Sequence, residues 1–302
     1  MQKYKKVIAC CAGVAVIFIW AGWITLSRYG MKTPLTPSDL TMLRYATALC
    51  FVSPLLLWYD WKKHSLSQWL VVGLGVGFPY TLLSFYGLKT IGAAHAGVLV
   101  NGMLPVLGTI AAYFIFSQKI SYLKYLAIIL IFVSNAMMAG GDVVRPEMLG
   151  GFLMLVGAAV VYTAHMTGIR LWNVHFKDVI VMVPLVNVVL FLPFFLLQPT
   201  SFDQIKISEL AVHAVYQGIV VNIVALMCVA YAIHHLGTIV VSLFMSFVPV
   251  VTAVFGWIFL EENLNGMQLL GIAGCTTGLL IYGLGAADSL RLLLRAIRSG
   301  RR

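Results

Sequence analysis

Several polar side chains lie well inside long apolar stretches of this sequence, where an unpaired polar group is expensive and is therefore a functional candidate. Tyr162 and His165 are three residues apart and would share one face of a helix. Asn101 lies one turn before Pro105, near the middle of another apolar stretch. Each of these groups can hydrogen-bond a small solute or a neighbouring helix, and His165 can also exchange a proton.

Residues of other apolar stretches offer similar contacts. Gln217 and Asn222 belong to one polar segment, and Ser246 follows another serine by one helical turn. Trp20 and Tyr80 present aromatic rings that can stack against a solute or pack between helices. The pattern indicates binding of a small molecule by amide, hydroxyl, imidazole and aromatic groups.

Sequence signals for enzymatic or metal chemistry are missing. No Gly-x-Ser-x-Gly, His-Glu-x-x-His or Cys-x-x-Cys segment occurs, and the five cysteines lie mostly in apolar surroundings. We therefore expect no enzyme, no metal site and no cofactor. All 10 acidic residues lie at or near the ends of apolar stretches, so no deep carboxylate is available to pair with a lipophilic cation. Zwitterionic or neutral solutes fit this pattern better than cationic drugs.

The composition requires a membrane environment for the 302 residues. The sequence is 61% hydrophobic and 10% charged, whereas a soluble domain carries about 25% charged residues. Soluble enzymes and disordered chains are thereby excluded. The apolar runs are continuous rather than alternating, which predicts an all-α membrane protein and not a β-barrel. The net charge of +10 is explained by membrane topology, so no nucleic-acid partner is expected.

A membrane helix needs about 20 predominantly apolar residues, and the sequence predicts ten transmembrane helices. They cover approximately residues 7–27, 38–58, 68–88, 93–116, 122–140, 148–169, 179–197, 210–233, 238–260 and 267–286. With both termini cytoplasmic, most lysines and arginines fall on the cytoplasmic side, as the positive-inside rule requires. We therefore expect a multi-pass protein of the cell (inner) membrane with both termini in the cytoplasm.

The second half of the sequence repeats the pattern of the first. Residues 92–141 align with residues 236–285 at an offset of 144, which places Pro105 on Pro249. Because each half holds five spans, the second half must enter the bilayer inverted, as in secondary transporters. The expected domains are a first five-helix repeat at 1–141, a second, inverted five-helix repeat at 142–286 and a basic cytoplasmic tail at 287–302.

The tail combines charge with an apolar face. Arg291, Arg295 and Arg298 would share one side of a helix, and leucines surround the rest. This pattern is typical of an interfacial helix that lies on the inner leaflet and binds anionic lipids.

Prolines and one arginine within the spans have structural as well as functional interpretations. Pro79, Pro105 and Pro249 each free a backbone carbonyl one turn earlier. Such kinks suit gating, or they simply bend a scaffold helix. Arg44 lies only a few residues below the outer surface, from which it can snorkel outward or pair. We expect a structural cap or a pairing role for Arg44 rather than a substrate contact.

Short motifs extend over both halves. They include Trp-Ala-Gly at 20–22, Arg44 in the second span, and Leu-Glu-Glu-Asn-Leu at 260–264, which Gln268 and Gly271 follow. Together with the two Pro-Val pairs, they resemble the drug/metabolite transporter superfamily in its EamA-type, ten-helix form. In the first half, Gln118 and Ala127 stand where the family pattern has glutamate and glycine.

The departure at Gln118 indicates that its counterpart Glu262 is a structural charge at a helix end and not an essential coupling group. The resemblance implies a transporter with a central cavity between its repeats. We expect the following residues to line it: Trp20, Tyr80, Asn101, Tyr162, His165, Gln217, Asn222 and Ser246.

The predicted function is secondary transport, with export of a small metabolite such as an amino acid by alternating access. The alternatives are efflux of multiple or cationic drugs, a non-transporting membrane scaffold, and an intramembrane enzyme. The expected partners are the small-molecule substrate and the lipid bilayer, and the protein acts as a monomer or a homodimer.

Overall fold

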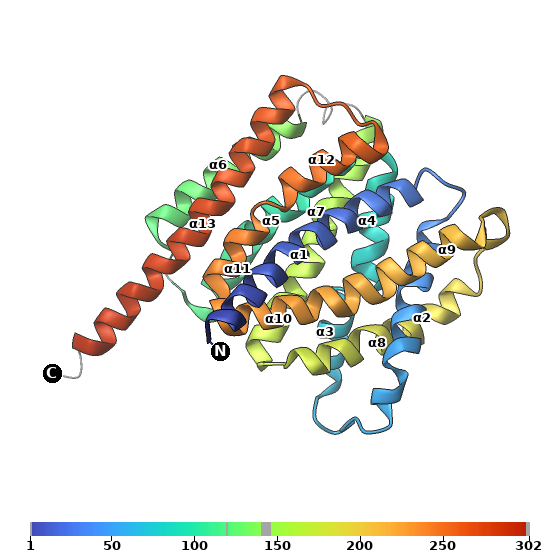
Figure 1. Cartoon of the computed structure of the whole chain (residues 1–302), viewed down its shortest axis with the longest axis horizontal. Coiled ribbons are helices and arrows are strands. Elements are labelled where there is room, and N and C mark those ends of the chain that lie inside the picture. The colour runs from blue at the N-terminus through green and yellow to red at the C-terminus, as the bar shows by residue number, and fades with distance from the viewer. Residues whose placement is uncertain (1, 119, 140–145, 300–302) are drawn as a thin grey trace.

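The computed structural model describes residues 2–118, 120–139 and 146–299 (Figure 1). No strand occurs among these residues, which confirms the all-α class. The first half contains α1 (Gln2–Gly30), α2 (Pro37–Leu56), α3 (Leu66–Gly75), α4 (Phe78–Thr90), α5 (Ala93–Phe116) and α6 (Tyr122–Ala139). The second half contains α7 (Pro146–Trp172), α8 (Phe176–Phe195), the 3-10 helix η2 (Phe202–Gln204), α9 (Ile207–His213), the π-helix η3 (Ala214–Val224), α10 (Ala225–Leu236), α11 (Thr238–Met245), α12 (Val248–Leu260) and α13 (Gly266–Ser299).

Within the described residues, eight helical segments are long and apolar enough to cross a membrane, and α6 adds a shorter apolar helix over Tyr122–Met138. The second of the ten expected spans, α2, is not among the eight. It carries two buried charged residues, Asp39 and Arg44, within its 20 residues. Large apolar side chains such as Phe132 and Leu197 are exposed on the bundle, which suits contact with lipid and not with water. The chain is therefore a multi-pass membrane protein.

The third expected span is a broken helix. α3 ends at Gly75 and α4 begins at Phe78, with Pro79 in its first turn. Asn187 of α8 bridges the break, because its amide nitrogen donates to the Gly73 carbonyl at 2.9 Å and its amide oxygen accepts the Phe78 N–H. A protein group thus satisfies backbone that lacks its helical partner, as the membrane interior requires.

Two further interruptions lie in the second half. The eighth span passes from α9 through η3 to α10, and the ninth divides into α11 and α12, with Pro249 in the first turn of α12. Pro105, by contrast, lies inside an unbroken α5. The structure therefore places Pro79 and Pro249 at true helix breaks and Pro105 within a continuous helix.

Helices of the two halves pack in matching pairs. Three pairs join counterparts directly: α2 with α8, α5 with α12, and α6 with α13. The contact of α1 with α10 matches that of α7 with α4, and the contact of α1 with α12 matches that of α7 with α5. The main helix–helix contacts of one half thus have counterparts in the other half, as expected for two repeats related by a pseudo-two-fold axis.

Two of the direct pairs run antiparallel. Gly271 near the start of α13 lies against Met138 at the end of α6, whereas Gly285 lies against Leu123 at the beginning of α6. In the same way, α5 starts beside the end of α12. The Ala93 N–H at the start of α5 donates to the side chain of Glu262, two residues after the end of α12. Figure 1 shows α6 and α13 side by side at the edge of the bundle.

α13 continues as one helix to Ser299, and Figure 1 shows the end of this helix projecting from the bundle. The basic tail expected at 287–302 stays a prediction. Residues 300–302 and the expected domain boundary at 141–142 lie outside the described residues.

The loop between α2 and α3 is held to the start of α8. Lys63 Nζ pairs with the Asp178 carboxylate at 2.8 Å, and His64 Nε2 lies 3.3 Å from the same group. The Tyr59 hydroxyl also donates to Asp178 at 3.3 Å. Burial raises the pKa of the Tyr59 phenol, and the negative charge of the Asp178 carboxylate is the second cause of this increase. These contacts fix one end of the α2–α8 pair.

Candidate functional site

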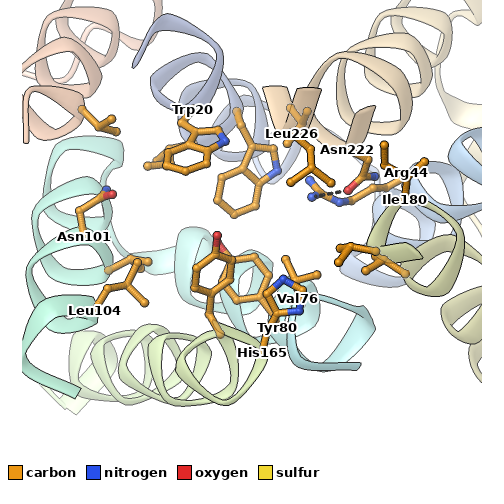
Figure 2. Close-up of a pocket in the computed structure, with 18 of the residues that line it drawn as sticks. Trp20, Arg44, Val76, Tyr80, Asn101, Leu104, His165, Ile180, Asn222 and Leu226 are labelled. Atoms are coloured by element: carbon orange, nitrogen blue, oxygen red, sulfur yellow. Dashed lines mark hydrogen bonds between the residues drawn. The ribbon is translucent and has the colours of Figure 1, made fainter. Parts of the chain in front are cut away.

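A cavity of about 130 Å³ lies at the centre of the bundle (Figure 2). Its walls come from α1, α2, α4, α5, α7, α8, η3, α10 and α12, with Val76 at the break between α3 and α4. Most of the lining residues are near the middle of their membrane-spanning segments, which is the depth at which transporters of inverted-repeat architecture bind their substrates. Six residues expected from the sequence line it: Trp20, Tyr80, Asn101, Tyr162, His165 and Asn222.

The other two expected residues lie outside the cavity wall. Gln217 is buried, and its side-chain oxygen accepts the indole N–H of Trp23 at 3.2 Å. Its amide nitrogen lies 3.4 Å from His213 Nδ1. Ser246 is also buried, and its hydroxyl donates to the Ser242 carbonyl at 3.0 Å. Gln217 therefore orients Trp23, which does line the cavity, and Ser246 completes the last turn of α11.

Aromatic rings form one wall of the cavity. The Trp23 and Tyr80 rings stack with centroids 5.7 Å apart, and Tyr162 lies 5.3 Å from Tyr80. The His165 ring continues the row at 5.7 Å from Tyr162. Such a wall offers flat apolar surface to a solute, with phenol and imidazole groups at its edges.

Two polar side chains of the cavity are oriented by backbone carbonyls. His165 Nδ1 lies 2.7 Å from the Val72 carbonyl, which fixes Nδ1 as the donor and leaves Nε2 as an acceptor in the neutral ring. The Asn101 amide nitrogen donates to the Gly97 carbonyl of its own helix at 2.7 Å. His165 thus bonds a neighbouring helix, which is one of its two expected roles, whereas Asn101 bonds within α5 and faces the cavity (Figure 2).

The structure shows Arg44 in a paired role, one of the roles expected from the sequence, with its side chain turned away from the outer surface. Its side chain is 3% exposed and lines the cavity, with the guanidinium over the rings of Trp23 at 5.4 Å and Tyr45 at 5.6 Å. Nη2 donates to Asn222 Oδ1 at 2.9 Å, a bond drawn in Figure 2. α2 turns this face inward, where the arginine cannot snorkel to water. Sequence position gave the depth of Arg44 but not its direction.

Both halves of the sequence match one protein family, described as the EamA-like transporter family, over residues 7–140 and 147–284. The chain belongs to this family. The match confirms the resemblance found in the motifs, and the fold built around the cavity is that of an EamA-like transporter.

Solved structures support the same fold. One of them, described only as the crystal structure of a protein, is 17% identical to this EamA-like chain, with a TM-score of 0.62. The alignment covers 91% of this chain and 97% of that chain. No curated protein matches the sequence.

Glu262 of the second EamA repeat joins three helix ends. Its Oε1 accepts from Arg28 Nε of α1 at 2.9 Å, and its Oε2 accepts the Ala93 N–H at the start of α5 at 2.7 Å. Lys32 lies 3.8 Å from the same carboxylate. Arg28 also donates to the Leu88 carbonyl near the end of α4. The carboxylate therefore neutralises Arg28 and caps a helix N-terminus, where negative charge is favourable.

The first EamA repeat builds the same turn without the charge. Ser117 and Glu261 both adopt a left-handed conformation, with φ of 50° and 55°. The next residue closes an identical bond in each repeat, from the Gln118 N–H to the Ala112 carbonyl and from the Glu262 N–H to the Gly256 carbonyl, both 3.1 Å long. Gln118 is thus the structural counterpart of Glu262, with a neutral amide in place of the carboxylate.

Gln118 borders a second cavity of about 180 Å³. Lys124 and Arg170 also line it, and Leu104 is shared between this cavity and the central one. The Arg170 guanidinium lies 4.2 Å from the centroid of the Phe116 ring. A basic pocket therefore lies beyond Leu104, at the end of the bundle opposite to Glu262.

Proposed function

We propose that this protein is a secondary transporter that exports a small metabolite such as an amino acid by alternating access through the central cavity. The observation that carries the proposal is the cavity itself, which is lined by polar and aromatic side chains from both EamA repeats. A folded scaffold has no need of such a pocket among otherwise apolar helices, whereas a carrier needs one near the membrane midplane.

The proposed topology has ten crossings with both termini in the cytoplasm of a cell (inner) membrane. It counts α3–α4, α9–η3–α10 and α11–α12 as one crossing each, and it includes α2 and α6. The matched packing of the two halves and the antiparallel α6–α13 and α5–α12 pairs support an inverted repeat. The basic end of α13 is proposed to contact anionic lipid. Accessibility labelling that found the two termini on opposite sides would contradict this topology.

The two ends of the bundle differ in a way that supports alternating access. α1 packs against α4 and α5 near Glu262. Among the described residues, the counterpart α7 makes no comparable contact with α10, α11 or α12. A Cβ on Gly92, the N-cap of α5, would lie 3.0 Å from Glu262, whereas one on Gly237, the N-cap of α11, would meet no described atom within 4 Å. The conformation is thus proposed to be closed outside and open toward the cytoplasm.

Replacing two cavity side chains should reduce transport. In proteoliposomes, the double variant Asn101→Leu, His165→Leu is expected to lower counterflow of radiolabelled amino acids by about tenfold, because each lost hydrogen bond is worth about 0.5–1.5 kcal/mol. The matched control is Thr277→Val, which removes an exposed hydroxyl of α13 whose bond is to the Ala273 carbonyl of its own helix.

Full flux in a folded double variant would remove these residues from the substrate path. No counterflow of any amino acid by the wild-type protein, with flux of a lipophilic cation such as tetraphenylphosphonium instead, would favour drug efflux. The cavity argues against that alternative, because its described lining residues include a guanidinium and no carboxylate. A proton gradient that leaves flux unchanged would exclude coupling through His165.

A further inference from the structure

The charge of the central cavity is unbalanced. Among the residues that the structure describes, Arg44 is the cationic group in its lining, and no carboxylate lines it. Among the described residues, the ion pairs lie elsewhere, at Glu262 and Asp178 near helix ends. Asp39, on the same helix as Arg44, uses its Oδ2 to accept the N–H groups of Thr36 and Ser201. It therefore caps the start of α2 and does not line the cavity.

Arg44 also has unused hydrogen-bonding capacity. A guanidinium carries five N–H donors, and one nitrogen, Nη2, is bonded to Asn222. Nε and Nη1 are buried without a hydrogen-bond partner in the structure. The rings of Trp23 and Tyr45 compensate part of the charge by cation–π contact. They do not accept the remaining N–H groups in the guanidinium plane.

The opposite repeat shows what a purely structural side chain at this place looks like. Asn187 of α8 lies near the position that corresponds to Arg44 of α2, and it bridges the α3–α4 break with a neutral amide. Its nitrogen bonds both the Gly73 and Val183 carbonyls. A short amide therefore suffices to join the two helices, and a guanidinium with free donors at the cavity is in excess of that need.

We propose that Arg44 binds the carboxylate of the transported solute, so that the substrates of this protein are small organic carboxylates. A carboxylate accepts two parallel N–H bonds from a guanidinium and supplies the missing negative charge in a low-dielectric site. The aromatic wall formed by Trp23, Tyr80 and Tyr162 would receive the apolar part of the solute. This assignment rests on the proposed transport function and names the chemical class that it carries.

Matched ligands test the assignment by direct binding to the purified full-length protein. The pairs are leucine with leucinamide, phenylalanine with phenylalaninamide, and hexanoate with hexanamide. Tryptophan fluorescence is a suitable readout because Trp20 and Trp23 line the cavity. For at least one pair, we expect the carboxylate to bind at least about tenfold more tightly than its amide, the range of a charge-assisted hydrogen bond. Failure of all three carboxylates to bind at millimolar concentration, or equal affinities within each pair, would overturn the assignment.

Variants of Arg44 give the second arm. Arg44→Gln should abolish the preference for the carboxylate and leave binding of the amide within about threefold. Arg44→Lys should retain part of the preference, because it keeps the charge but loses the planar fork. Lys89→Gln, at the end of α4 and outside the cavity lining, is the control and should bind as the wild type does. An unchanged carboxylate preference in folded Arg44→Gln overturns the proposal. If that variant does not fold, the ligand pairs and Arg44→Lys decide the question with folded protein.

Binding and flux separate this inference from the proposed function. Arg44-dependent carboxylate binding without counterflow in proteoliposomes would refute transport and support the assignment. Counterflow of carboxylates and amides alike, unaltered in Arg44→Gln, would support transport and refute the assignment.

Discussion

Asn187→Leu is expected to lower the Tm of the purified protein by roughly 5–15 °C. The substitution removes the group that bridges the α3–α4 break and leaves the Gly73 carbonyl and the Phe78 N–H buried without this partner. Each such orphaned group costs about 1–3 kcal/mol, and 1 kcal/mol corresponds to about 2–4 °C in a chain of this size class. Thermal unfolding in detergent, followed by the near-ultraviolet signal of the tryptophans, would measure the change.

Asn135→Leu is the matched control, since it makes the same substitution in another apolar helix. The Asn135 amide donates to Ile131 of its own helix at 2.9 Å, and its oxygen is buried without a partner. Its removal should therefore shift the Tm by less than about 3 °C. Similar Tm values for Asn187→Leu and Asn135→Leu would show that the bridge at the broken helix does not stabilise the fold.

The contrast between these two asparagines shows where sequence analysis reaches its limit. Apolar length alone predicted the span at 93–116 with the bounds of α5, and the charged breaks placed most other helix ends. The break after Gly75 was foreseen only as a proline kink at Pro79. Asn187, which bridges that break, was not singled out, because the two groups that it bonds at the break are more than 100 residues away in the sequence.

The second limit of the sequence analysis is the direction in which a side chain points around its helix. In the segment 216–222, Gln217 and Asn222 were both expected at the cavity, but η3 is a π-helix, which rotates successive residues differently from an α-helix. Asn222 consequently meets Arg44, while Gln217 points to Trp23. For Arg44, the sequence left outward snorkelling and pairing both open, and the structure shows it paired with Asn222. Sequence spacing states how deep a residue lies, whereas tertiary packing decides which neighbour it faces.

Glu262→Gln is expected to open the proposed outer end of the transporter. It removes a carboxylate that bonds Arg28 and the Ala93 N–H, both partly buried contacts. Hydrogen bonds to charged groups are worth about 1.5–3 kcal/mol, so the ratio of outward-open to inward-open molecules should rise by about tenfold or more. A single cysteine at Ile24, in a background without the exposed native cysteines, would then react faster with a membrane-impermeant maleimide added outside.

The reciprocal change uses the symmetry of the two repeats. Gln118 occupies the same left-handed turn as Glu262 and borders the pocket that contains Arg170, so Gln118→Glu supplies the missing charge at the opposite end. It should favour closure on the cytoplasmic side and shift the labelling of Ile24→Cys in the same direction as Glu262→Gln. Ser121→Ala, in the same loop region, is a neutral control that should leave labelling unchanged. Opposite shifts for Glu262→Gln and Gln118→Glu would contradict this mechanism. They would show that the charge at residue 262 and the neutral amide at residue 118 do not determine which end of the transporter is closed.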